Sequence, residues 1–98
     1  MPRAHDTSEP TLRVLHALAA QPDSWHHGYP ISKTTGIKSG SLYPILIRLS
    51  ERGYLESRWE PSEKEGRPAR HAYRITASGQ QFLREQAVLL QTLQLRLL

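Results

Sequence analysis

Apolar residues recur near the start of the chain at the spacing of an α-helix. Ser8 is a suitable N-cap, and Pro10 is tolerated in the first helical turn. A proline cannot continue a helix, so we expect the segment 21–23 (Gln-Pro-Asp) to end this one. The next residues, 25–28, are interpreted as a loop. The predicted apolar face of the first helix consists of Leu12, Leu15, Leu18 and Ala19.

Two further helices are predicted before the middle of the chain. The first is short, runs over about 29–35, and is followed by Gly36, a typical helix stop. The second should begin close before Pro44, with Ser39 or Ser41 as its cap, and should end at Gly53. Its buried stripe is Leu42, Ile45, Leu46 and Leu49. Its opposite face carries Gly40, Tyr43, Pro44, Ile47 and Arg48, with Ser41 at the edge.

A hairpin and a last helix complete the pattern. Alternation over 55–60 predicts a half-buried strand with Leu55, Ser57 and Trp59 on one face, and 71–75 predicts a second strand. The segment 61–69 between them is a long charged tip. Thr76 then caps a helix that reaches toward Leu98, and we expect its near-heptad stripe to form a dimer interface. That stripe is Leu83, Ala87, Leu90, Leu93 and Leu97.

The short second helix, its turn and the polar-faced third helix together look like a helix-turn-helix. In that motif the third helix enters the major groove of DNA. Hydroxyls can bond base edges, an outward isoleucine can touch a thymine methyl, and basic side chains can meet phosphates or guanine. The candidates are Lys38, Ser39, Ser41, Tyr43, Ile47 and Arg48. An ordinary amphipathic helix with a solvated outer face is the alternative.

The distribution of charge favours a polyanion as the partner. The chain of 98 residues has a net charge of +4, and residues 31–75 hold nine Lys and Arg against five Glu. At the hairpin tip, Lys64, Arg67 and Arg70 could follow a DNA backbone or reach a narrow minor groove. Because Glu63 and Glu65 partly cancel this charge, a solvated loop is the alternative.

Other classes of protein find little support. Without cysteine there are no disulfides or thiolate metal sites, and a cytoplasmic location is expected. The apolar runs are too short to span a membrane. His26 and His27 are adjacent and should point apart, with no acid or cysteine to complete a metal site. We identify no catalytic constellation and expect neither enzyme activity nor a cofactor. Trp25 and Trp59 are interpreted as core or hairpin anchors.

Several segments together resemble the PadR family of transcriptional regulators. They are 27–31 (His-Gly-Tyr-Pro-Ile), 35–36, 40–49 (Gly-Ser-Leu-Tyr-Pro-Ile-Leu-Ile-Arg-Leu), 53–57, 59–60, 66–68 (Gly-Arg-Pro), 73–76 and Gly79. The resemblance covers roughly residues 12–85 and implies a winged helix-turn-helix that represses promoters at inverted repeats and dimerises through its last helix. It places Ser41, Tyr43 and Arg48 on the recognition helix, and Gly66, Arg67 and Arg70 in the wing.

Two departures from the family pattern matter. Ser50 stands where the family usually has glutamate, which could remove an ion pair. Some relatives sense flat aromatic drugs with a tryptophan on the last helix. Here Phe82 is the one aromatic residue of that helix, so this route of drug sensing is not expected.

The sequence therefore predicts a mainly α fold with a β-hairpin. Residues 1–8 are expected to form a tail, 9–76 a winged helix-turn-helix domain, and 77–98 a dimerisation helix. The expected partners are double-stranded DNA and a second copy of the chain. A winged helix that binds another protein instead of DNA is the rival interpretation. The operator, the regulated genes, the direction of regulation and any effector ligand are left open.

Overall fold

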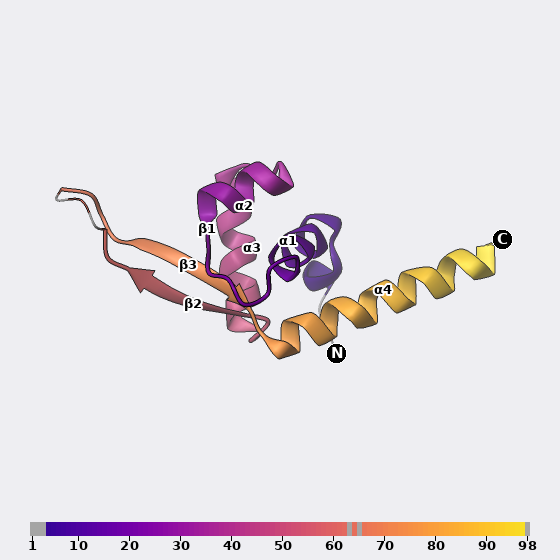
Figure 1. The fold of residues 1–98 in the computed structure, drawn as a ribbon. Helices are drawn as coiled ribbons and strands as arrows, with labels where there is room; N and C mark the ends of the chain where they lie inside the picture. The colour runs from indigo at the N-terminus through magenta and orange to yellow at the C-terminus, as the bar shows by residue number, and fades with distance from the viewer. Residues whose placement is uncertain (1–3, 63, 65, 98) are drawn as a thin grey trace.

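The computed structural model describes residues 4–62, 64 and 66–97, with the backbone alone for 4, 5, 96 and 97. A bundle of three helices is joined to a small sheet, and a long last helix leaves on the side opposite the hairpin (Figure 1). The elements are η1 (Ala4–Thr7), α1 (Glu9–Ala19), β1 (His26–His27), α2 (Gly28–Thr35), α3 (Ser39–Glu51), β2 (Leu55–Glu60), β3 (Arg70–Ile75) and α4 (Ala77–Leu97). This is the winged-helix arrangement that the sequence predicts.

The ends of the first three helices follow local sequence signals, with one exception. Ser8 caps α1 by accepting a hydrogen bond from the Thr11 amide, and α2 ends at Gly36, whose φ is 74°. The prediction that Ser39 or Ser41 caps α3 is wrong. The cap position is Lys38, whose side chain makes no capping hydrogen bond, because the backbone already turns helical at Ser39.

The core lies between α1, α3 and the start of the sheet. The predicted stripe of α3 is confirmed: Leu42, Leu46 and Leu49 are fully buried and Ile45 is nearly so. The buried face of α1 is rotated slightly about the helix axis relative to the predicted face. Thr11, Val14, Leu15 and Leu18 are buried, whereas Leu12 and Ala19 are only half-buried.

The sheet contains a strand that the sequence did not predict. Strands β2 and β3 pair antiparallel from Leu55 opposite Ile75 to Glu60 opposite Arg70. The segment interpreted as a loop supplies β1, which pairs with β3 on its other edge. A strand of two residues has no periodicity of its own, so only its pairing with β3 identifies it.

The predicted buried face of β2 is also wrong beyond its first residue. Leu55 is buried, but Ser57 is exposed and Trp59 is 66% exposed. The hairpin projects beyond the helices, which leaves both of its faces in solvent toward the tip (Figure 1).

The last helix is anchored at its start and exposed along the rest. As predicted, Thr76 caps it: its hydroxyl oxygen lies 3.0 Å from the Gly79 amide and 2.7 Å from the Gly53 carbonyl oxygen. Phe82 is buried and stacks on Tyr54 with ring centroids 4.4 Å apart. Among the described residues no helix is long and apolar enough to cross a membrane.

Part of the expected N-terminal tail is built into the fold. Asp6 lies in η1, is 1% exposed, and has one carboxylate oxygen 3.2 Å from the Arg52 Nε. Residues 4–7 therefore form a short 3-10 helix that lies against α1, and Asp6 links it to Arg48 and Arg52, rather than extending as a free tail.

Candidate nucleic-acid interface

The turn between α2 and α3 is fixed by side-chain hydrogen bonds. The Thr35 hydroxyl donates to the Ile31 carbonyl and accepts from the Ile37 amide, and the Ser32 hydroxyl donates to the Ile37 carbonyl at 2.6 Å. From α1, the Arg13 guanidinium donates to the Thr35 carbonyl at 2.8 Å. These bonds hold α3 at a defined angle to α2, as a rigid reading element requires.

The start of α3 is open to solvent. Lys38, Ser39 and Ser41 are all exposed. The first amides of a helix have no carbonyl partners within it, and here the cap residue supplies no side-chain acceptor. A helix start of this kind, next to a lysine, suits an anionic phosphate.

The outward face of α3 carries both polar and apolar groups, as predicted. Tyr43 is 44% exposed and Ile47 is 55% exposed. The tyrosine ring lies against the start of α2. The approach is so close that a Cβ built on Gly28 would be 2.6 Å from the Tyr43 hydroxyl oxygen. An exposed isoleucine among polar residues has the chemistry to contact a thymine methyl group.

Arg48 does not lie on this outward face, contrary to the expectation. Its guanidinium turns back toward the N-terminal segment, where Nη2 donates to the Thr11 hydroxyl at 3.2 Å and Nε lies 3.9 Å from Asp6. Helical spacing places the Cα of Arg48 near the outer face. Its long side chain nevertheless bends inward, toward the buried carboxylate of Asp6. We therefore leave it out of the candidate interface.

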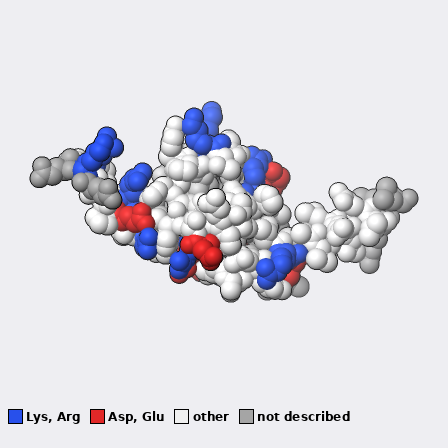
Figure 2. Space-filling view, viewed as in Figure 1, with Lys and Arg blue, Asp and Glu red and all other residues white. Residues whose placement is uncertain are grey.

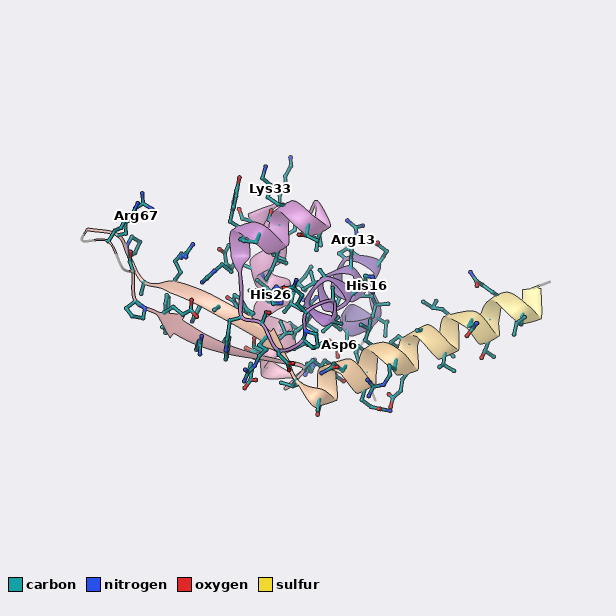
Figure 3. All side chains as sticks on the ribbon, viewed as in Figure 1. Asp6, Arg13, His16, His26, Lys33 and Arg67 are labelled. Carbon is teal, nitrogen blue, oxygen red and sulfur yellow. The ribbon has the colours of Figure 1, made fainter. Side chains whose placement is uncertain are left out.

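The hairpin tip presents its basic side chains to solvent. We call residues 60–70 the wing. Lys64, Arg67 and Arg70 are exposed, and Gly66 has a φ of 82° in the turn between them. Arg67 on the wing and Lys33 on α2 project from the same side of the molecule (Figure 3). On that side, lysine and arginine side chains gather on the wing and above the helices (Figure 2). Glu63 and Glu65 lie outside the described residues.

A side-chain hydrogen bond joins the wing to the helix-turn-helix. The His27 Nε2 is 2.6 Å from a carboxylate oxygen of Glu60, whose other oxygen accepts from Arg58 at 2.8 Å. The hydrogen bond from His27, followed by that from Arg58, lowers the pKa of the Glu60 carboxyl below its usual value. The bond between His27 and Glu60 fixes the root of the wing against the residue that precedes α2.

The two adjacent histidines diverge, as the sequence suggested. The His26 Nε2 lies 3.1 Å from the Gln21 carbonyl oxygen, whereas His27 turns to Glu60. No cluster of three or more metal-ligating side chains is found within the described part of the chain.

Sequence reasoning missed several exposed aromatic and basic contacts. Tyr29 at the start of α2 is 70% exposed, and Trp59 stacks on His71 with ring centroids 3.7 Å apart. Trp59 is therefore a hairpin anchor, as interpreted, but it is not buried. Trp25 packs under two guanidinium groups, with the Arg58 and Arg74 Cζ atoms 4.0 and 4.5 Å from its ring centroid. Trp25 directly precedes β1, so only the pairing of β1 with β3 brings it next to Arg58 and Arg74.

The residues expected to form a dimer interface are mostly unpacked in the single chain. Leu83 is half-buried, Ala87 is exposed, and Leu90 and Leu93 are 54% and 46% exposed. The side chain of Leu97 lies outside the described residues. Val88, Leu89 and Leu95 are exposed as well, so the apolar surface extends around much of the helix.

Comparison with known proteins relates the whole fold to one class of regulator. The family model described as "Transcriptional regulator PadR-like family" matches residues 14–85. A transcriptional regulator structure from Thermoplasma acidophilum is 30% identical, with 90% of this chain and 85% of that chain covered and a TM-score of 0.69. A Streptococcus mutans structure, smu.1704, is 31% identical, with 88% and 82% covered and a TM-score of 0.66.

A PadR-like transcription factor structure from Bacteroides fragilis is 23% identical, with 89% of this chain and 84% of that chain covered and a TM-score of 0.75. At that identity it shows the fold alone. No curated protein is significantly similar to the chain.

Proposed function

The chain belongs to the PadR-like family of transcriptional regulators, and from that premise we propose that it is a repressor that binds an inverted-repeat operator as a homodimer. The family consists of DNA-binding regulators, so a winged-helix module that binds only proteins is the weaker interpretation. The observation that carries the proposal is that the helix-turn-helix and the wing face the same side of the molecule. Basic side chains of the helices and of the wing project from one side of the molecule (Figure 2).

Each candidate residue has a role that follows from its position. Ser41, Tyr43 and Ile47 read base edges in the major groove, because they are exposed on the outward side of α3. Lys38 and Ser39 bind phosphates at the helix start. In the wing, Lys64, Arg67 and Arg70 follow the backbone or enter the minor groove.

The dimer in this proposal is formed by α4. Leu90, Leu93 and their exposed apolar neighbours would face a second copy of the chain. A two-fold dimer places two recognition helices about one DNA turn, roughly 34 Å, apart, and such an arrangement requires an inverted repeat.

Selection of bound sequences from random DNA tests this function. We expect an inverted repeat to emerge, and we expect affinity for it to fall steeply as salt rises, because bound phosphates release counterions. Failure to select any sequence, or affinity that is indifferent to salt, would favour the protein-interaction module.

A variant of the recognition helix tests the assignment of residues. Tyr43→Ala should weaken binding to the selected site by about 1–3 kcal/mol, and the variant should still fold cooperatively, because the ring is 44% exposed and lies outside the hydrophobic core. Gln81→Ala, exposed at the start of α4, is the matched control and should bind like the wild type. Wild-type affinity of the Tyr43 variant would remove this residue from the interface.

A further inference from the structure

A cleft of about 300 Å³ separates the start of α2 and α3 from the root of the wing. We propose that this cleft seats the sugar–phosphate backbone of one DNA strand, with Trp59 and Tyr29 as its principal contacts. The inference rests on the proposed function and adds two residues to it: Trp59, interpreted from the sequence as a core or hairpin anchor, and Tyr29, which sequence reasoning did not single out. The cleft is lined by His27, Gly28, Tyr29, Tyr43, Trp59, Ala69, Arg70 and His71.

The cleft gathers most of the exposed large apolar side chains of the globular part. Among the described residues before α4, those side chains are Tyr29, Tyr43, Ile47 and Trp59. Three of the four line this one cleft. Aromatic side chains with polar tips, grouped on a surface and left in water, are typical of a binding site rather than of a solvated face.

The Trp59 ring is positioned by stacking on one side and is open to solvent on the other. One face of its ring system stacks on His71 at a centroid distance of 3.7 Å, and His71 in turn meets the edge of Tyr73 at 5.7 Å. Tyr73 is buried in the core, so the stack is anchored from below. Two thirds of Trp59 still faces solvent. Because the ring already stacks on His71, less conformational entropy remains to be lost on binding than for a side chain without such a contact.

The charges around the cleft suit a phosphate. Arg70 is exposed at its rim, and the nearby Glu60 carboxylate is occupied by His27 and Arg58. A second cleft of about 450 Å³ shares Gly28, Tyr29 and Tyr43 with the first and continues to Lys38 and Ser39 at the start of α3. The two form a continuous track with basic groups at both ends and tyrosine hydroxyls between them.

The position of the track selects the backbone rather than a base as its occupant. In a duplex, each strand's sugar–phosphate backbone separates the major groove from the neighbouring minor groove. A helix in one groove and a wing at the other must therefore hold that backbone between them. The Tyr29 hydroxyl and the Arg70 guanidinium would bind phosphate oxygens, and the indole of Trp59 would pack on the apolar face of a deoxyribose.

Backbone contacts make a distinctive prediction, because they position the duplex without reading its sequence. Trp59→Ala and Tyr29→Phe should each lower affinity for the selected operator and for scrambled DNA by the same factor, about tenfold. Ser41→Ala should lower operator affinity alone. Trp59→Phe, which keeps a ring on His71, should recover most of the loss and guards against a folding defect. In a Trp25→Phe background, the emission of Trp59 should change on binding either DNA.

The outcomes separate this inference from the proposed function. If wild-type protein binds its operator but the Trp59 and Tyr29 variants bind both DNAs normally, the cleft is not a backbone site although the regulator stands. A loss confined to the operator would mean that these residues read bases, which also overturns the inference. If the wild type binds no DNA in a salt-dependent way, the proposed function itself fails.

Discussion

At the scale of single residues, a buried carboxylate holds α3 to the start of the chain. Asp6 lies beside the guanidinium groups of Arg48 and Arg52, both on or directly after α3. Ser50, between these two arginines, donates to the Leu46 carbonyl of its own helix. The acidic partner of these arginines therefore comes from outside the matched family segment, from η1.

Neutralising this carboxylate should destabilise the fold. Asp6→Asn keeps the shape but leaves two half-buried arginines without their counter-charge, which we expect to cost about 1–3 kcal/mol. Denaturant unfolding measures the loss. The matched control is Glu9→Gln, which removes an exposed pair with Arg13 and should not change stability measurably. Equal stability of the two variants would show that η1 does not anchor α3.

At the scale of elements, the position of α4 depends on one close backbone approach. Gly79 is buried in the first turn of that helix, and a Cβ there would lie 2.2 Å from the Tyr54 carbonyl oxygen and 2.8 Å from Ile75 Cγ1. The carbonyl also accepts the Thr76 amide at 3.0 Å, so it cannot move freely. The start of α4 is thus fixed against the turn that precedes β2.

Adding one methyl group at this position should separate the two elements. Gly79→Ala is expected to destabilise the fold by about 1–3 kcal/mol, because backbone rather than a flexible side chain must give way. Thermal unfolding measures it, with Gly40→Ala as the control. That glycine is helical and exposed, with no described atom within 4 Å of an added Cβ, so alanine should stabilise by about 0.5–1 kcal/mol. A Gly79 variant that melts like the wild type would contradict the close packing.

At the scale of the whole molecule, α4 makes the chain long and narrow. The molecule measures 57 × 24 × 22 Å, and the free end of α4 lies far from the wing (Figure 1). A helix of 21 residues is about 31 Å long, which is more than the small core can cover. A second chain on α4 would leave the wing and α3 accessible to DNA.

Charges placed in the apolar stripe should therefore prevent formation of the proposed dimer. Leu90→Glu with Leu93→Glu should give a monomer that melts cooperatively but loses most operator affinity, because the two half-sites no longer bind as one linked event. Gln91→Glu with Gln94→Glu adds the same charge to other faces of the helix and should stay dimeric. Sedimentation measures both. A wild-type monomer that still binds its operator tightly would refute the model.

The sequence by itself determined the elements whose signals are local. The stripe of α3 from Leu42 to Leu49 and the stops at Gly36 and Gly53 depend on helical periodicity and on a backbone region that glycine favours, and the structure has all of them. The hairpin and the Thr76 cap were found for the same reason. The exposure of Tyr43 and Ile47 was predictable because neither residue lies on the buried stripe.

Only the tertiary structure decided the features that depend on distant neighbours. The strand β1 exists because β3 offers an edge for it to pair with. Arg48 turns inward because Asp6, 42 residues earlier in the chain, supplies a buried carboxylate. Trp59 is exposed because the outer part of the hairpin projects beyond the helices. Periodicity reports which face of an element is apolar, but not what lies opposite each residue. Long side chains and short strands take their direction from that opposite partner, which the fold alone supplies.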